Sequence, residues 1–225
     1  VDEQVFHGKQ CYLGLDLSAR NDLTALAMIA QADDGAWHVR MEFFAPLHGI
    51  ADRAHRDRAP YDVWAEKGLI LATPGASVDY ALVAERLVAL CDEHDVAVIA
   101  FDRWRIDVLK AELARVDREL PLKEFGQGFK DMGPALDTVE GELLNGRVRH
   151  GGHPVLTWCA ANAIAVKDPA GNRKLDKSKA TGRIDGMVAL AMAFGVAVSA
   201  EADAPTSMYE LLAQEQARDA NRPTA

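Results

Sequence analysis

Short apolar runs separated by turn-forming residues predict three β-strands in the first part of the chain. The predicted strands are Gln10 to Leu17, Thr24 to Gln31 and Trp37 to Ala45. Asn21-Asp22 and Asp33-Asp34-Gly35 would form the turns between them, because Asn, Asp and Gly favour turn conformations. Further along the chain, the apolar runs Val96 to Phe101 and Leu122 to Phe125 predict two more strands.

Helical spacing of apolar residues prevails in the rest of the chain. Asp79 to His94 and Ile106 to Leu120 each carry an apolar stripe, and Pro60 divides Ile50 to Lys67 into two short helices. The other predicted helices are Ala135 to Asn145, Pro154 to Val166 and the run that begins at Asp185. The order β-β-β-α-β-α-β-α predicts an α/β fold, in which helices flank a mixed sheet on both faces.

Three aspartates lie at the boundaries of these elements. Asp16 ends the first strand, Asp102 ends the strand that starts at Val96, and Asp185 opens the last helix. A buried carboxylate is costly unless a positive charge meets it, and neighbouring carboxylates repel one another. Hard divalent cations prefer carboxylate oxygen, and ligands of α/β sheets gather at the carboxyl ends of strands. The three aspartates therefore predict a site for Mg²⁺ or Mn²⁺.

A carboxylate site of this kind favours a nuclease. Two metal ions about 3.5–4 Å apart can activate water, neutralise the transition state and stabilise the leaving oxygen of a phosphodiester. We expect Asp16 to bridge two ions, Asp102 to complete one and Asp185 the other, with Asp22 as a fourth ligand from the first turn. Taken singly, Asp185 could instead be a helix cap, and Asp102 or Asp22 a turn residue.

A basic segment from Lys167 to Arg183 comes immediately before Asp185. Pro169 to Asn172 is rich in turn formers, so the segment predicts a β-hairpin beside the metal site. We expect it to contact the phosphate backbone of DNA, which is a sequence-independent contact, although a solvated charged loop is the alternative. The predicted DNA-binding residues are Arg173, Lys174, Lys177 and Lys179 of this segment, and Arg103 beside Asp102.

Composition narrows the class of protein further. The chain has 225 residues, enough for one large domain, and its 49% hydrophobic content is that of a globular protein. The net charge of −9 argues against a general nucleic-acid coat, so phosphate binding would depend on local basic residues and metal. No apolar stretch is long enough to span a bilayer. Cys11, Cys91 and Cys159 fit reduced, buried thiols better than disulfides or a zinc site.

Several other histidines and tryptophans are assigned to structural roles, and the motifs of two ATPase classes are absent or incomplete in the sequence. His150 and His153 lie close together, but no third zinc ligand is obvious, so a surface loop is favoured. Trp64, Trp104 and Trp158 are assigned to packing rather than to base stacking. The sequence lacks the phosphate loop of P-loop ATPases. Gly14-Leu15-Asp16 could suggest an actin-like ATPase, but that fold needs a duplicated domain for which this chain is too short.

The motifs together resemble the C-terminal nuclease of tailed-phage large terminase subunits, a member of the ribonuclease H-like superfamily. The resemblance runs from about Tyr12 to Val198. It rests on the motifs Gly14-Leu15-Asp16-Leu17-Ser18 with Asp22-Leu23-Thr24-Ala25, Phe101-Asp102-Arg103-Trp104, Phe125-Gly126-Gln127-Gly128-Phe129, His150-Gly151-Gly152, and Arg183-Ile184-Asp185-Gly186 with Val188-Ala189-Leu190.

This resemblance implies a Mg²⁺- or Mn²⁺-dependent endonuclease that cuts concatemeric double-stranded viral DNA during genome packaging. The metal-binding acids of the family fall on Asp16, Asp102 and Asp185, and the additional acid on Asp22; its amide and basic positions fall on Asn162, Lys174 and Lys177. The implied partners are double-stranded DNA, the portal protein and the small terminase subunit, in the cytoplasm of the infected bacterial host, with no membrane partner.

The resemblance also implies how the chain is divided. An ATPase motor precedes the nuclease in the family, and the non-Met start suggests that this chain is the nuclease half alone. We expect a nuclease domain over residues 1–200 and a polar tail over 201–225, partly helical or disordered. The rival functions are a junction resolvase or transposase-type nuclease of the same fold, and a non-catalytic docking module of a packaging motor.

Overall fold

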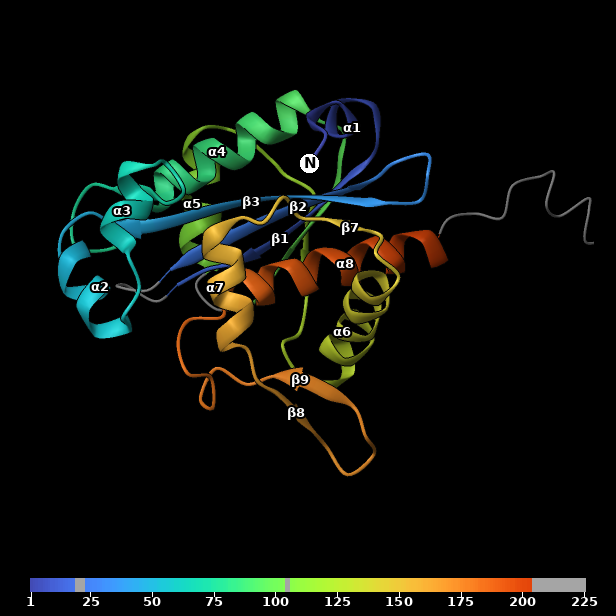
Figure 1. The fold of residues 1–225 in the computed structure, drawn as a ribbon. Coiled ribbons are helices and arrows are strands. Elements are labelled where there is room, and N and C mark those ends of the chain that lie inside the picture. The colour runs from blue at the N-terminus through green and yellow to red at the C-terminus, as the bar shows by residue number, and fades with distance from the viewer. Residues whose placement is uncertain (19–22, 104–105, 204–225) are drawn as a thin grey trace, which may run out of the picture.

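A mixed β-sheet with helices on both faces forms the centre of a computed structural model that describes residues 1–18, 23–103 and 106–203 (Figure 1). Its first three strands, β1 (Cys11–Asp16), β2 (Thr24–Gln31) and β3 (Trp37–Pro46), form an antiparallel meander. The other strands pair in parallel: β5 (Val96–Phe101) with β1, β6 (Leu122–Glu124) with β5, and β4 (Leu71–Thr73) and β7 (Val148–Arg149) with β3. The strand order is β4-β3-β2-β1-β5-β6, with β7 also on β3.

Helices cover the two faces of this sheet as separate layers. One face packs against α1 (Glu3–Gly8), α4 (Tyr80–Glu93) and α5 (Ile106–Arg115), and the other against α6 (Phe129–Leu144), α7 (Pro154–Asn162) and α8 (Asp185–Asp203) (Figure 1). Because both faces are covered, every residue of β1 is buried. Two short helices, α2 (Ile50–Asp57) and α3 (Tyr61–Glu66), follow β3.

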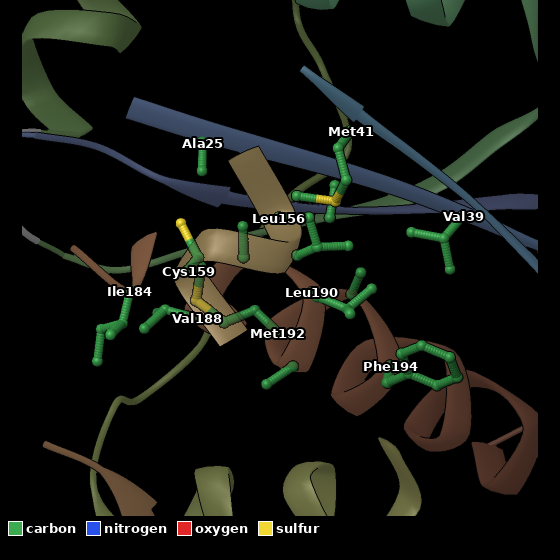
Figure 2. Packing of buried hydrophobic residues seen from close by; sticks show 14 of the residues in the cluster. Ala25, Val39, Met41, Leu156, Cys159, Ile184, Val188, Leu190, Met192 and Phe194 are labelled. Atoms are coloured by element: carbon green, nitrogen blue, oxygen red, sulfur yellow. The ribbon is translucent and has the colours of Figure 1, made fainter. Parts of the chain in front are cut away.

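The larger core cluster lies between the sheet and α8. Figure 2 shows Val188, Leu190, Met192 and Phe194 of α8 beside side chains of β3 and α7. Within α8, Val188 to Ala193 are all buried. A helix that is apolar all round in this way belongs in the interior of a domain. In the described ranges, no helix has the length and apolar character that crossing a membrane requires.

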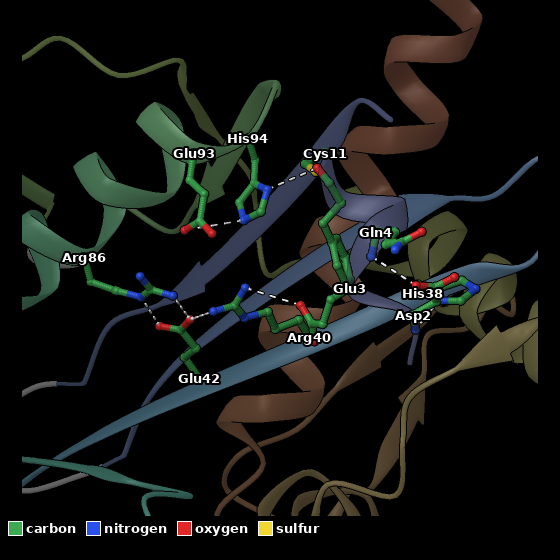
Figure 3. Close-up of polar contacts among 11 residues, drawn as sticks. Asp2, Glu3, Gln4, Cys11, His38, Arg40, Glu42, Arg86, Glu93 and His94 are labelled. Carbon is green, nitrogen blue, oxygen red and sulfur yellow. Dashed lines mark hydrogen bonds and ion pairs between the residues drawn. The ribbon is translucent and has the colours of Figure 1, made fainter. Parts of the chain in front are cut away.

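A chain of ion pairs holds the opposite layer to the sheet (Figure 3). Arg86 of α4 binds Glu42 of β3 through contacts of 2.6 and 2.8 Å. Glu42 also lies 3.3 Å from Arg40, and Arg40 lies 3.5 Å from Glu3 of α1. These ion pairs therefore connect α1 and α4 to β3 on this face of the sheet.

The α/β class, the mixed sheet and its flanking helices are confirmed. Strand β2 has the predicted bounds, and Pro60 does separate two short helices. The predicted hairpin exists as β8 (Ala165–Lys167) paired antiparallel with β9 (Arg173–Leu175). The tail predicted from residue 201 stays a prediction, because the structure describes the chain only to residue 203.

Several predicted boundaries are wrong. Helix α5 ends at Arg115 rather than Leu120, because the backbone turns at Asp117 with a φ of +51°. Helix α6 begins six residues earlier than predicted, at Phe129, and contains Pro134. Helix α7 ends at Asn162, since residues 165–167 pair with β9 instead of continuing the helix. Helix α1 and strand β7 were not predicted.

Candidate active site

The ends of two parallel strands bring Asp16 and Asp102 to one edge of the sheet. Leu15 of β1 pairs with Phe101 of β5, so the residues that follow them, Asp16 and Asp102, emerge side by side at the carboxyl ends of the strands. Asp16 is only 2% exposed, whereas Asp102 is half-buried. This is the edge at which ligands of α/β sheets gather.

Helix α8 brings Asp185 to the same edge. The helix packs directly against the backbone of β1, because a Cβ on Gly14 would lie 2.0 Å from the carbonyl oxygen of Ala189. Close to the start of the helix, a Cβ on Gly186 would lie 2.9 Å from the ring of Phe43. The two glycines therefore set how near the first turn of α8 comes to the sheet, and so the position of Asp185.

An ammonium group joins the two buried aspartates. Lys177 lies after β9 and extends its Nζ to Asp16, 2.7 Å from Oδ2 and 3.0 Å from Oδ1. The same Nζ lies 3.4 Å from Oδ1 of Asp185. Gln127, in the loop between β6 and α6, donates its Nε2 hydrogen to Asp16 at 3.3 Å. The other oxygen of Asp185, Oδ2, is buried and has no hydrogen-bond partner among the described residues.

The electrostatics of this cluster are those of two buried carboxylates held by a partly exposed ammonium. Burial and the neighbouring Asp16 carboxylate raise the pKa of Asp185 to about 7, against the opposing effect of Lys177 and Arg183. For Lys177, burial disfavours the charged form, but the carboxylates of Asp16 and Asp185 outweigh it and hold the pKa above its ordinary value. The two carboxylates therefore stabilise a positive charge placed between them.

A cavity of about 310 Å³ opens over these groups. Its polar lining consists mainly of Asp16, Asp102, Gln127, Lys177, Arg183 and Asp185. All three predicted aspartates thus line one cavity. In the described part of the chain, however, no three His, Cys, Asp or Glu side chains form a group that could hold a metal ion. Asp22, the predicted fourth ligand, lies outside the described residues.

The donor set fits a hard divalent cation. Its members are carboxylate oxygens, which Mg²⁺ and Mn²⁺ prefer, and one of them is a buried oxygen without a partner. The position between Asp16 and Asp185 already holds a positive charge. By their chemistry Asp16, Asp102 and Asp185 could hold a metal, but as placed they do not form a three-ligand group among the described residues, so a metal site there stays a prediction.

The predicted DNA-binding residues make different contacts, and only Lys177 among them lines the cavity. Arg173 pairs with Asp137 and Glu140 of α6, which fixes the hairpin to that helix. Lys174 places its Nζ 5.1 Å from the ring centroid of Phe129, also on α6. Arg103 lies 2.6 Å from Glu124. Lys179 is exposed, and Lys177 binds the two aspartates. A DNA contact by any of the five stays a prediction.

Three polar residues of the cavity were not predicted as site residues, namely Ser18, Gln127 and Arg183. Gln127 follows β6, which is parallel to β5, so its place after a parallel strand was the available signal. Arg183 lies 3.5 Å from Asp57 at the end of α2. Asn162, which the resemblance singled out, accepts a hydrogen bond from Thr181 at 2.9 Å and so braces the loop that leads to Asp185.

The residues assigned to structural roles do pack in the fold. Trp64 and Trp158 lie with ring centroids 5.6 Å apart, against Tyr61. Of the two histidines assigned to a surface loop, His150 is exposed and accepts a hydrogen bond from the backbone of Gly152. His153 instead lies half-buried at the start of α7, against the ring of Phe43. Trp104 lies outside the described residues.

Comparison with known proteins gives consistent matches. Residues 1–201 match the family model described as the terminase large subunit, endonuclease domain. The chain is 59% identical over 189 residues to the terminase large subunit of Enterobacteria phage HK97, and 30% identical over 205 residues to protein YmfN of Escherichia coli K12. These alignments cover 84% and 86% of this chain, but only 38% and 44% of the two relatives.

Solved structures agree with the sequence matches. The crystal structure of the HK97 large terminase superposes with a TM-score of 0.81 at 58% identity, over 85% of this chain and 40% of that one. The large terminase nuclease of thermophilic phage G20c superposes with a TM-score of 0.55 at 13% identity, over 83% and 82% of the two chains. That nuclease has also been solved with bound magnesium and with bound cobalt. The predicted ribonuclease H-like fold is confirmed.

Proposed function

Because the chain belongs to the family of terminase large subunit endonuclease domains, we propose that it is a metal-dependent nuclease that cuts concatemeric double-stranded viral DNA during genome packaging. The observation that carries the proposal is the meeting of Asp16 and Asp185 at one positive charge, in the wall of a cavity that Asp102 also lines. The carboxylates come from β1, β5 and α8, so rigid elements hold them.

In this proposal Asp16, Asp102 and Asp185 would hold one or two ions of Mg²⁺ or Mn²⁺, with Asp22 as a further ligand. When bound, the ions would supply an activated water and neutralise the charge that develops on the phosphate. The G20c nuclease, which shares the fold, binds magnesium and cobalt, and this supports a divalent ion here. Gln127 would orient Asp16 through its hydrogen bond.

Basic residues beside the cavity would position the DNA backbone. Arg173, Lys174, Lys177 and Lys179 belong to or follow the hairpin, and Arg103 follows the strand end that carries Asp102. Phosphate contacts of this kind fix the register of the duplex without reading its sequence. The proposed cleavage is therefore tolerant of sequence at the cut site.

The setting and partners follow from the family and are part of the proposal. The HK97 relative is a phage terminase large subunit, and this chain spans about two fifths of it. We therefore extend the proposal to an ATPase domain in the same packaging subunit, and to the portal protein and small terminase subunit as partners. The activity would take place in the cytoplasm of the infected bacterial host.

A cleavage assay tests the proposal. Supercoiled and branched DNA are incubated with the protein in Mg²⁺, Mn²⁺ or EDTA. We expect nicking and linearisation that need the metal, and a loss of more than about a hundredfold in rate for Asp102→Ala and Asp185→Asn, because losing a metal ligand costs more than losing an outer partner. Glu85→Gln, which changes an exposed acid on α4, is the matched control and should keep full activity.

Other outcomes would point to other functions. Equal cleavage by wild type and Asp185→Asn would exclude the aspartates as the cutting centre. Strong preference for branched DNA would favour a junction resolvase, and no cleavage of either DNA together with no metal binding would favour a docking module.

A further inference from the structure

We propose that the Lys177 ammonium occupies the position of a divalent cation between Asp16 and Asp185, and that it must leave before a metal ion can bind there. The inference rests on the proposed function, since it concerns the same carboxylates. Under this proposal Lys177 has two roles and cannot perform both at once. Without metal, Lys177 holds the carboxylates together; with metal, it is free to contact a phosphate.

The contacts of Lys177 commit its ammonium group to the two aspartates. A lysine ammonium has three donors and no acceptor. Its Nζ contacts both oxygens of Asp16, at 2.7 and 3.0 Å, and one oxygen of Asp185, at 3.4 Å. An ammonium held between the two carboxylates in this way does not extend outward to the phosphate backbone of DNA. Holding the carboxylates and binding DNA are therefore alternative states of the same side chain.

A metal ion and the ammonium cannot occupy this position together. Mg²⁺ lies about 2.0–2.1 Å from its oxygen ligands and needs near-ideal geometry. A second cation within hydrogen-bond distance of the same carboxylate oxygens would be repelled strongly at such short range. Binding of the metal between Asp16 and Asp185 therefore requires that Lys177 moves away.

The fold gives Lys177, and not the aspartates, the freedom to move. The carboxylates are only 3% and 10% exposed on β1 and α8, whereas the Lys177 side chain is 46% exposed. Asp176 holds the local turn, because its side chain accepts from the backbone of Ser178 at 2.9 Å. The Lys177 side chain can thus swing outward on its flexible stem while the turn stays in place.

Competition of this kind weakens the apparent affinity for metal. When a competing state fills a site, the apparent dissociation constant rises by the inverse of the fraction that is free. If Lys177 occupies the position nine-tenths of the time, the apparent Kd is about tenfold higher than that of the open site. Removing the ammonium should therefore tighten metal binding, and the loss of the positive charge that neutralises the aspartates acts in the same direction.

The test measures metal binding without DNA and compares wild type with Lys177→Met, which keeps an unbranched side chain one atom shorter and removes the charge. Mn²⁺ and Ca²⁺ are titrated by calorimetry, and free Mn²⁺ is followed by its paramagnetic resonance signal. We expect Lys177→Met to bind Mn²⁺ about tenfold more tightly than wild type. Lys177→Arg, which keeps the positive charge, should not gain affinity. Lys130→Met, an exposed lysine on α6, is the matched control and should bind as wild type does.

Each other result decides against the inference. Equal or weaker Mn²⁺ binding by a folded Lys177→Met overturns it while leaving the proposed nuclease intact. If neither protein binds metal, the inference and the proposed function both fail. If Lys177→Met does not fold without metal, the test is a crystal structure of the wild-type protein soaked in Mn²⁺. If Lys177 still bridges Asp16 and Asp185 beside the bound ion, the metal does not displace the ammonium and the inference is wrong. Failure of metal-loaded wild type to cut DNA removes only the proposed function, because the affinities are measured separately.

Discussion

Gly14 lies where α8 crosses β1, and it is the residue whose replacement should disturb the site most without touching a charge. A Cβ there would meet the backbone of α8 at 2.0 Å, and backbone cannot move aside as a side chain can. We expect Gly14→Ala to lower the free energy of unfolding by about 3 kcal/mol, at the upper end of overpacking effects, and to weaken metal binding because α8 carries Asp185.

Urea denaturation followed by circular dichroism measures this change. Gly141→Ala in α6 is the matched control, since a Cβ there would have no heavy atom within 4 Å. That substitution should leave stability unchanged or raise it by up to about 1 kcal/mol, because alanine favours the helix over glycine. Equal stability of the two variants would contradict the close packing of α8 on β1.

At the scale of residues, the sequence predicted acids better than it predicted their partners. Asp16 and Asp102 could be found because each follows a buried strand, and a carboxylate there calls for a cation. Lys177 was expected beside the site as a DNA-binding residue, but its pairing with Asp16 could not be predicted, because the two lie 161 residues apart in the chain. Local patterns show which residues lie at element ends, but they do not show which distant side chain reaches them.

At the scale of elements, the start of α7 should make stability depend on pH. His153 is the N-cap residue of this helix, its ring packs against Phe43, and burial lowers its pKa from the ordinary value of 6.5. The unfolded chain therefore takes up a proton near pH 6.5 that the folded chain takes up only at lower pH. Stability should be fully present above that range and should fall as the pH decreases through it.

The measurement compares the free energy of unfolding of wild type and His153→Gln between pH 8 and pH 5. The difference between the two proteins should change as the pH falls, with wild type losing more stability than the variant. Other titrating groups, such as Asp57 and Asp185, are common to both proteins and cancel in the difference. Parallel pH curves would show that His153 does not titrate differently on folding.

Element boundaries were predicted where local chemistry determines them and missed where tertiary contacts do. Pro60 separates α2 from α3 through its own backbone restriction, and it could be recognised directly. The end of α7 depends instead on pairing of residues 165–167 with β9, and β7 exists only because it pairs with Trp37 and His38 of β3. No local pattern contains these partners.

At the scale of the whole molecule, the fold could be predicted from the order of its elements. Strands connected through helices must run parallel, so β5 and β6 had to place Asp102 and the Gln127 loop at the edge where β1 ends. The side on which the hairpin docks was not predictable, because Arg173 reaches it through Asp137 and Glu140 on α6. The arrangement of the strands follows from how they are connected, but the docking of the hairpin on α6 depends on pairs of side chains.

The whole molecule has a net charge of −9, so any binding to DNA must depend on where its basic residues are placed. Each phosphate contact contributes about 0.9 to the slope of log affinity against log salt. If Lys174 and Lys179 contact phosphates, the Lys174→Ala, Lys179→Ala double variant should lower that slope by about 1.8 in fluorescence-anisotropy titrations between low and moderate salt. Lys67→Ala with Lys130→Ala removes the same charge from exposed positions just after α3 and on α6. If both double variants change the slope equally, overall charge governs binding rather than the hairpin; a change confined to the first assigns the phosphate contacts to the segment beside the aspartates.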